Sequence, residues 1–78
     1  MPTVLRSGPY RFFFYAGDRA EPSHVHVERD NSLAKYWLEP IVLQSSNGFN
    51  RGELMDIYRL ISENQTLLLT KCHEFFGR

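Results

Sequence analysis

The predicted fold depends most on residues 23–39, which read SHVHVERDNSLAKYWLE. Histidine and valine alternate before Asp30, and this period of two is typical of a strand with one buried face. Asp30 and Asn31 tolerate the positive φ angles of a two-residue turn. The stretch therefore predicts a β-hairpin with strands over residues 23–28 and 33–39.

The turn fixes the register of this hairpin. If Asp30 and Asn31 are the loop residues, Arg29 lies opposite Ser32 and every further pair follows. The other pairs are Glu28–Leu33, Val27–Ala34, His26–Lys35, Val25–Tyr36 and His24–Trp37. The core face should carry Val25, Val27, Ala34, Tyr36 and Leu38. The opposite face should carry His24, His26, Glu28, Lys35 and Trp37.

Two more strands complete the predicted sheet. One covers residues 10–16, after Gly8 and Pro9, and it contains an aromatic run that is apolar on both faces. A short apolar segment at residues 41–43 follows Pro40 and can form a fourth strand. We therefore expect an antiparallel meander of three to four strands.

From Asn50 onward the apolar residues follow the period of a helix, predicted over residues 50–76 with Gly77 as its stop. Asn50 and Glu53 have the spacing of a capping box. The apolar stripe consists of Leu54, Ile57, Ile61, Leu68, Cys72 and Phe75. Its members Leu54, Ile57, Ile61, Leu68 and Phe75 should pack on Val25, Val27, Tyr36 and Leu38. The predicted fold class is α+β, a single domain over residues 1–78 with a long C-terminal amphipathic helix on one face of the sheet.

The length of this helix raises a second question. A straight helix over residues 50–76 would be about 40 Å long, whereas a domain of this size has a radius of gyration of about 11–12 Å. Either the helix breaks near residues 62–66, where the apolar stripe lapses, or its end docks on a second subunit. We favour the long helix and a homodimer.

Composition excludes several classes of protein. The chain has 78 residues, nine basic and nine acidic side chains, and a single cysteine. One cysteine cannot form an intrachain disulfide scaffold or a cysteine-rich zinc fold. No run of apolar residues is long enough to span a membrane, and the N-terminus is too short and mixed for a signal peptide. We expect a cytoplasmic protein.

Several segments together resemble one known family. They are Glu21–Val27, Ala34–Pro40, Asn47–Asn50 and His73–Gly77. The set resembles a family of small bacterial proteins of unknown function that is marked by a Glu-Pro-Pro-His-Val-His-Val motif. In this chain Ser23 replaces the second proline of that motif, and Lys71 and Cys72 stand where the family commonly has tryptophan. The resemblance implies a component of a toxin–antitoxin pair with a protein partner encoded nearby, and it brings no catalytic residues.

His24 and His26 are the most concentrated chemical signal. Two histidines two positions apart on a strand point to the same face and can share a divalent transition metal. The nearest third ligand in sequence is Glu28, while His73, Cys72 or Glu39 would need the helix or a strand end to cross that face. The predicted neighbours Lys35 and Trp37 disfavour a metal, because a cation repels it and an indole stacks rather than coordinates.

The same pair could act in acid–base catalysis. Histidine titrates near neutrality, so His24 and His26 could serve as base and acid on an RNA 2′-hydroxyl, with Lys35 or Arg29 steadying a phosphate. No phosphate-binding loop or nucleophile motif accompanies them. Cys72 lies on the apolar stripe, which indicates a buried thiol rather than a nucleophile.

The third interpretation is an interaction surface. One helix cannot cover both faces of a small sheet, so the face with the histidines should be open. Aromatic and basic side chains dominate interface energetics and also suit single-stranded nucleic acid. The predicted surface consists of Arg11, Phe13, Tyr15, His24, His26, Arg29, Lys35 and Trp37. We favour an interaction module that binds a protein partner, with a His-dependent nuclease or metal-dependent enzyme at His24 and His26 as the alternative.

Overall fold

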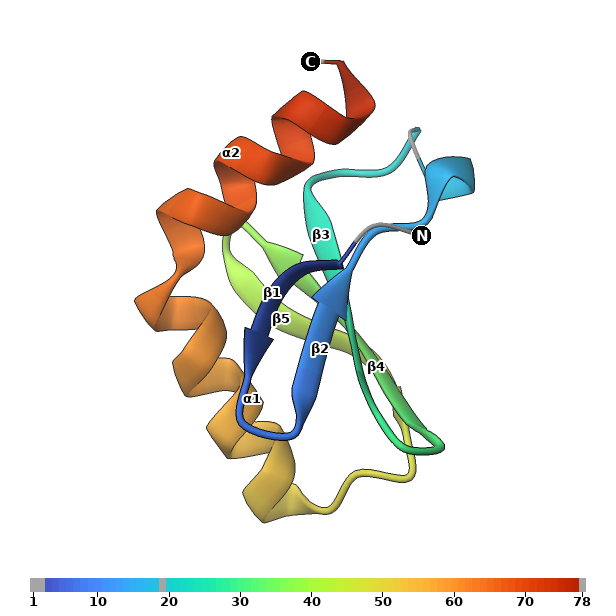
Figure 1. The fold of residues 1–78 in the computed structure, drawn as a ribbon, viewed down its shortest axis with the longest axis vertical. Helices are drawn as coiled ribbons and strands as arrows, with labels where there is room; N and C mark the ends of the chain where they lie inside the picture. The colour runs from blue at the N-terminus through green and yellow to red at the C-terminus, as the bar shows by residue number, and fades with distance from the viewer. Residues whose placement is uncertain (1–2, 19, 78) are drawn as a thin grey trace.

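The computed structural model describes residues 3–18 and 20–77 and has an α+β fold (Figure 1). Five strands form one antiparallel sheet in the order β1-β2-β3-β4-β5, and two helices follow. The strands are β1 (Thr3–Ser7), β2 (Tyr10–Phe13), β3 (His24–Arg29), β4 (Ser32–Leu38) and β5 (Ile41–Asn47). A short 3₁₀ turn covers Ala16–Asp18, and the helices are α1 (Arg51–Glu63) and α2 (Gln65–Phe76). The predicted meander is confirmed, but it has five strands rather than three to four.

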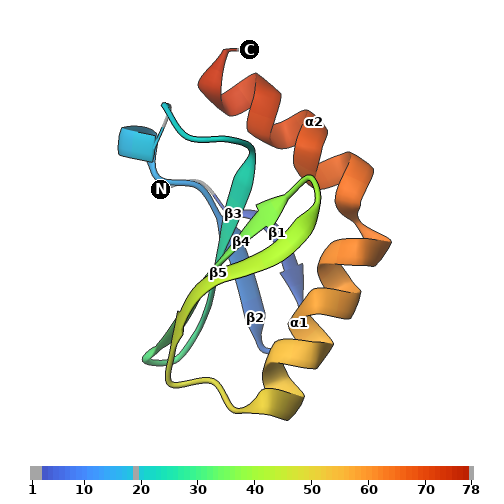
Figure 2. The same cartoon turned by 180° about the vertical axis from the view of Figure 1, so that it is seen from behind.

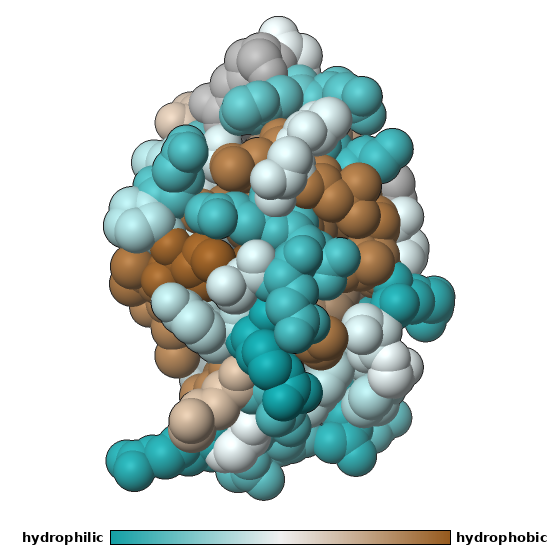
Figure 3. Space-filling view, turned by 90° about the vertical axis from the view of Figure 1, so that its left-hand side faces the viewer, coloured by the Kyte–Doolittle hydropathy of each residue, from teal (hydrophilic) through white to brown (hydrophobic). Residues whose placement is uncertain are grey.

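Both helices lie on the same face of the sheet, and the other face is open (Figures 1 and 2). This confirms the predicted placement of the C-terminal helical segment. The outer surface of the helices is a mainly hydrophilic band with apolar side chains gathered on either side of it (Figure 3). Within the described residues, no helix combines the length and the apolar character needed to span a membrane.

The β3–β4 hairpin has the predicted register. All six pairs from Arg29–Ser32 to His24–Trp37 are formed. Asp30 has a φ of 54°, as a tight turn of this kind requires. The turn thus places the histidines on the open face.

One strand was missed, and two predicted strands were wrong at their C-terminal ends. β1 was missed, because a five-residue strand with Arg6 in it has too weak an apolar pattern to be read alone. The strand expected at residues 10–16 ends at Phe13, since Ala16 begins the 3₁₀ turn. β5 continues to Asn47 rather than ending at Leu43, because the polar residues 45–47 are also paired with β4 through their backbone.

The long continuous helix was also wrong, and the alternative break at residues 62–66 is confirmed. Asn64 separates α1 from α2 with φ −119° and ψ 19°. Its side-chain amide donates to the Leu60 carbonyl at 2.8 Å, and its backbone N–H points to the carbonyls of Leu60 and Ile61. Asparagine competes in this way with helical hydrogen bonding. The argument for a homodimer from helix length therefore no longer applies.

The helix ends follow the predicted capping chemistry. The Glu53 N–H donates to Asn50 Oδ1 at 2.8 Å, and the Asn50 N–H donates to Glu53 Oε1 at 3.1 Å. These reciprocal bonds form the capping box. Gly77 ends α2 with a φ of 72°, the left-handed conformation that glycine adopts most readily.

The core lies between the sheet and the two helices. Its fully buried members include Phe12, Phe14, Val25, Val27, Tyr36, Leu38, Ile57, Ile61, Leu68 and Cys72. Leu54 and Phe75, expected at the centre, are only partly buried against it, whereas Phe76 is 5% exposed. Leu68, Cys72 and Phe76 are four positions apart in α2, so Phe76 continues the buried row of this helix and Phe75 lies one position off it.

The buried hydroxyl of Tyr36 should make the stability of the fold depend on pH in the alkaline range. This hydroxyl donates to the Leu54 carbonyl at 2.9 Å, and burial raises its pKa from 10.0 to about 12. The stabilisation that protonated Tyr36 gives the folded state is fully present below pH 10, the pKa of tyrosine in the unfolded chain. It is lost as the pH rises toward 12, the pKa in the folded state. We expect the free energy of unfolding to fall by about 2–3 kcal/mol over that range. Urea titrations of the wild type and Tyr36→Phe check this: the variant should lack that component, and equal losses in both proteins would contradict it.

Candidate functional site

An aromatic layer covers the open face of the sheet. Phe13 stacks on His26 with ring centroids 5.5 Å apart. Tyr15 meets the edges of both rings, at 5.2 Å from Phe13 and 4.5 Å from His26. These contacts leave Phe13 only 1% and His26 only 8% exposed, although both helices lie on the other face of the sheet (Figure 2). The layer is therefore a packed surface rather than a set of loose side chains.

Two cations lie over this layer, and each has an acidic partner. The Arg11 guanidinium is 4.5 Å from the centre of the Phe13 ring and forms an ion pair with Glu28. The Lys35 ammonium is 4.9 Å from the Trp37 ring and forms an ion pair with Glu21. Contacts of this kind hold a cation over an aromatic face. The open face is thus close to neutral in charge.

His24 is a buried packing residue. Its side chain is 0% exposed, and its Nδ1–H donates to the Pro22 carbonyl at 2.9 Å. The ring meets His26 edge-on at 5.3 Å and Trp37 edge-on at 6.1 Å. Phe76, at the end of α2, is 5.8 Å away. An imidazole enclosed in this way can hold β3 to the C-terminal helix, but it is poorly placed to reach a substrate.

Among the described residues, no third metal ligand joins the histidine pair. Glu28, the predicted third ligand, is held by Arg11. The end of α2 does approach β3, but there His73 Nε2 lies 3.5 Å from the hydroxyl of Ser23. Across residues 3–18 and 20–77, no three side chains among His, Cys, Asp and Glu gather as a metal site would require. Cys72 is buried in the core, as predicted.

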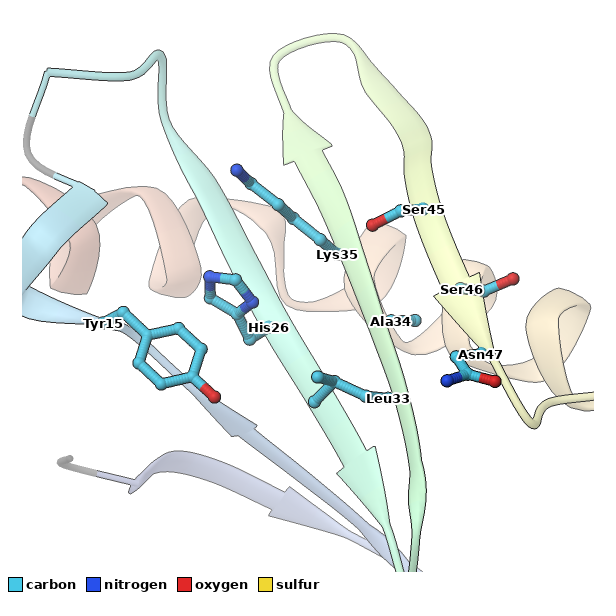
Figure 4. Close-up of a pocket in the computed structure, with 8 residues that line it drawn as sticks. All are labelled: Tyr15, His26, Leu33, Ala34, Lys35, Ser45, Ser46 and Asn47. Atoms are coloured by element: carbon cyan, nitrogen blue, oxygen red, sulfur yellow. The ribbon is translucent and has the colours of Figure 1, made fainter.

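A hollow of about 230 Å³ lies beside the aromatic layer (Figure 4). His26 lies between Tyr15 and Lys35 in this view, and the helices are behind the sheet. The lining residues are Tyr15, His26, Leu33, Ala34, Lys35, Ser45, Ser46 and Asn47. Hydroxyl, amide and ammonium groups thus surround an apolar floor, which suits a side chain that has both apolar and polar parts.

The structure gathers most of the predicted surface but not all of it. Arg11, Phe13, Tyr15, His26, Lys35 and Trp37 share the open face, and His24 lies buried at its edge. Arg29 lies on the other face, where it forms an ion pair with Glu53 of α1. Its predicted place on the open face was therefore wrong, although the alternation along β3, which puts Arg29 with Val25 and Val27, would have indicated the other side.

Five lining residues were not part of the predicted surface: Leu33, Ala34, Ser45, Ser46 and Asn47. Leu33 has the same parity as Lys35 and could have been found from the hairpin register. Ser45 and Asn47 could not, because a register shift opposite Lys35 and Tyr36 alters the alternation in β5. Only the backbone pairing places these two side chains at the hollow.

The comparisons with known proteins support a family assignment without a chemical function. Neither a curated protein nor a solved structure matches the chain. A family model described as a domain of unknown function, DUF4160, matches residues 10–73, which include the hairpin, α1, most of α2 and most of the open face. By this match, the chain belongs to the DUF4160 family.

Proposed function

We propose that this chain is a cytoplasmic protein-interaction module, one component of a toxin–antitoxin pair, and that its open face binds a protein partner encoded nearby. The observation that carries the proposal is the packed aromatic layer with a hollow beside it. Tyrosine, tryptophan and arginine supply much of the energy of protein interfaces, and Tyr15, Trp37 and Arg11 lie here together.

The charge of this surface favours a protein over a nucleic acid. Nucleic-acid binding needs cations that can neutralise phosphates. Arg11 and Lys35 already have Glu28 and Glu21 as partners. A partner with an apolar or aromatic side chain for the hollow and a few polar groups for its rim fits better.

The enzymatic alternative at His24 and His26 is less well supported. A general acid or base must come within hydrogen-bonding reach of its substrate. His24 is fully buried, and His26 is almost covered by Phe13 and Tyr15. These histidines suit a role in shaping the binding surface.

The test compares two leucines of similar exposure, one at the hollow and one on α2. Leu33 at the hollow is 37% exposed, and Leu67 on α2 is 40% exposed. The tagged chain is co-expressed with the product of its neighbouring gene, and the affinity of the purified pair is measured by calorimetry. Leu33→Arg should weaken binding at least about tenfold, because a charged chain would fill the hollow, and Leu67→Arg should not. No binding by the wild type, or equal effects of the two variants, would overturn the proposal.

A further inference from the structure

The strand β5 forms one edge of the sheet. It is seven residues long, and β4 is its one neighbour in the sheet formed by the described residues. Figure 2 shows β5 nearest to the viewer, along the outer side of β4. An edge strand of this length presents backbone N–H and C=O groups that can pair with another strand.

This edge lacks two of the usual protections against such pairing, charged side chains and proline, although its pairing with β4 is irregular between Leu43 and Ser45. Residues 40–50 contain no charged side chain, and β5 itself contains no proline. Val42 is 48% exposed and Leu43 is 39% exposed. Proteins generally guard an edge with charged residues, prolines, bulges or short strands. The other edge, β1, is shorter and carries Arg6, so β5 is the less protected of the two.

We infer that β5 pairs antiparallel with β5 of a second copy of this chain, which joins the two sheets across a twofold axis. Most homodimers are twofold symmetric, and a twofold axis perpendicular to the sheet, beside the edge strand, makes the two copies of β5 antiparallel. This surface differs from the open face of the proposed function, which remains available in the dimer.

The charge pattern is what selects a second copy as the occupant. Self-pairing sets residues of β5 opposite residues of the same strand, so a charge near the axis would face its own copy. β5 has no charge at any position, so each register avoids this repulsion. The whole chain also has a formal net charge of zero, so two copies do not repel each other at long range.

The regular part of β5 indicates where the axis lies. The register with β4 is continuous over Ile41, Val42 and Leu43 and shifts before Ser45. A bulge disrupts pairing, so the regular segment is the better partner. Pairing centred on Val42 sets Val42 against its own copy and Leu43 against Ile41, which buries the exposed apolar side chains of the edge.

The experiment measures the mass of the purified full chain by light scattering over a range of concentrations. The wild type should approach twice the 9.2 kDa of the monomer. Val42→Lys should remain a monomer, because two ammonium groups would meet at the axis, while Met55→Lys on α1, where Met55 is 66% exposed, should dimerise like the wild type. Circular dichroism verifies that each variant is folded. If Val42→Lys does not fold, Val42→Cys should give a disulfide-linked dimer on oxidation.

Several outcomes would overturn the inference. One is a wild-type monomer at the highest soluble concentration. Another is a dimer that persists in folded Val42→Lys. A third is a Val42→Cys variant that forms no disulfide-linked dimer on oxidation. A dimer broken by Leu33→Arg instead would place the interface on the open face. If the chain is a monomer and Val42→Lys abolishes its binding to the neighbouring gene product, the edge strand binds that partner instead of a second copy. If the chain is a monomer and only Leu33→Arg abolishes this binding, the dimer is excluded and the proposed function still holds.

Discussion

Phe14→Ala is expected to lower the free energy of unfolding by about 3–5 kcal/mol. Phe14 follows β2 directly and is 0% exposed. Its ring lies 5.5 Å from Phe75 and 5.9 Å from Phe76, so it joins the sheet to the end of α2. Removing the ring opens a cavity where the two layers meet, and the neighbouring rings can close it only in part.

The effect is large relative to the stability of the domain. A chain of 78 residues has a total stability of about 4–12 kcal/mol. Urea unfolding of the wild type, Phe14→Leu and Phe14→Ala should therefore give a graded loss, and the alanine variant should be largely unfolded at 37 °C if the wild type lies at the low end. A loss below about 1 kcal/mol for Phe14→Ala would show that α2 is not held by this ring.

Local patterns predicted the hairpin because its determinants lie within one short stretch. The turn at Asp30 and Asn31 and the alternation of β3 specify all six pairs, and the structure has each of them. The capping box at Asn50 is local in the same way. Where the chemistry of a structure is set within a few residues, the sequence alone is enough to find it.

The features that were missed depend on long-range pairing. β1 and the second half of β5 are strands because a neighbouring strand satisfies their backbone, not because their side chains alternate strongly. The break at Asn64 was the less favoured of two alternatives, because helix length alone could not distinguish a break from a helix end docked on a second subunit. The Gln65 side chain donates to the Leu38 carbonyl at 2.7 Å, which ties the break to the end of β4. Such a contact becomes visible only once the sheet is assembled.

In the candidate site, too, local sequence predicted some features, and others depend on long-range contacts. The register of the hairpin put His26, Lys35 and Trp37 on one face, and the structure has them there beside Phe13 of β2, which was also expected on this surface. Burial was not foreseen. An exposed histidine pair was expected on an open face, but Phe76 and Trp37 enclose His24, and Phe13 and Tyr15 cover His26. This enclosure is the main reason to favour an interaction surface over catalysis.

His24→Ala is expected to lower the free energy of unfolding by about 2–4 kcal/mol, because it leaves a cavity and removes a buried hydrogen bond. The Pro22 carbonyl loses its donor, and Phe76 loses a ring contact. His24→Asn keeps a short amide donor near Pro22 and should recover part of the loss. His26→Ala should cost less, since His26 retains some exposure at 8%. Urea titrations of the three variants against the wild type measure these differences.

The same variants separate a packing role from a metal site. If His24 is a packing residue, a chelator should leave the unfolding midpoint of the wild type unchanged, and added zinc should not raise it. The described residues offer the two histidines no third ligand, and two imidazoles alone hold zinc weakly. A midpoint that rises with zinc in the wild type but not in His24→Ala would contradict this, because a ligand stabilises only the protein that binds it. That result would favour the metal-dependent enzyme over the interaction module, and His26→Ala would then have to lose the zinc effect as well.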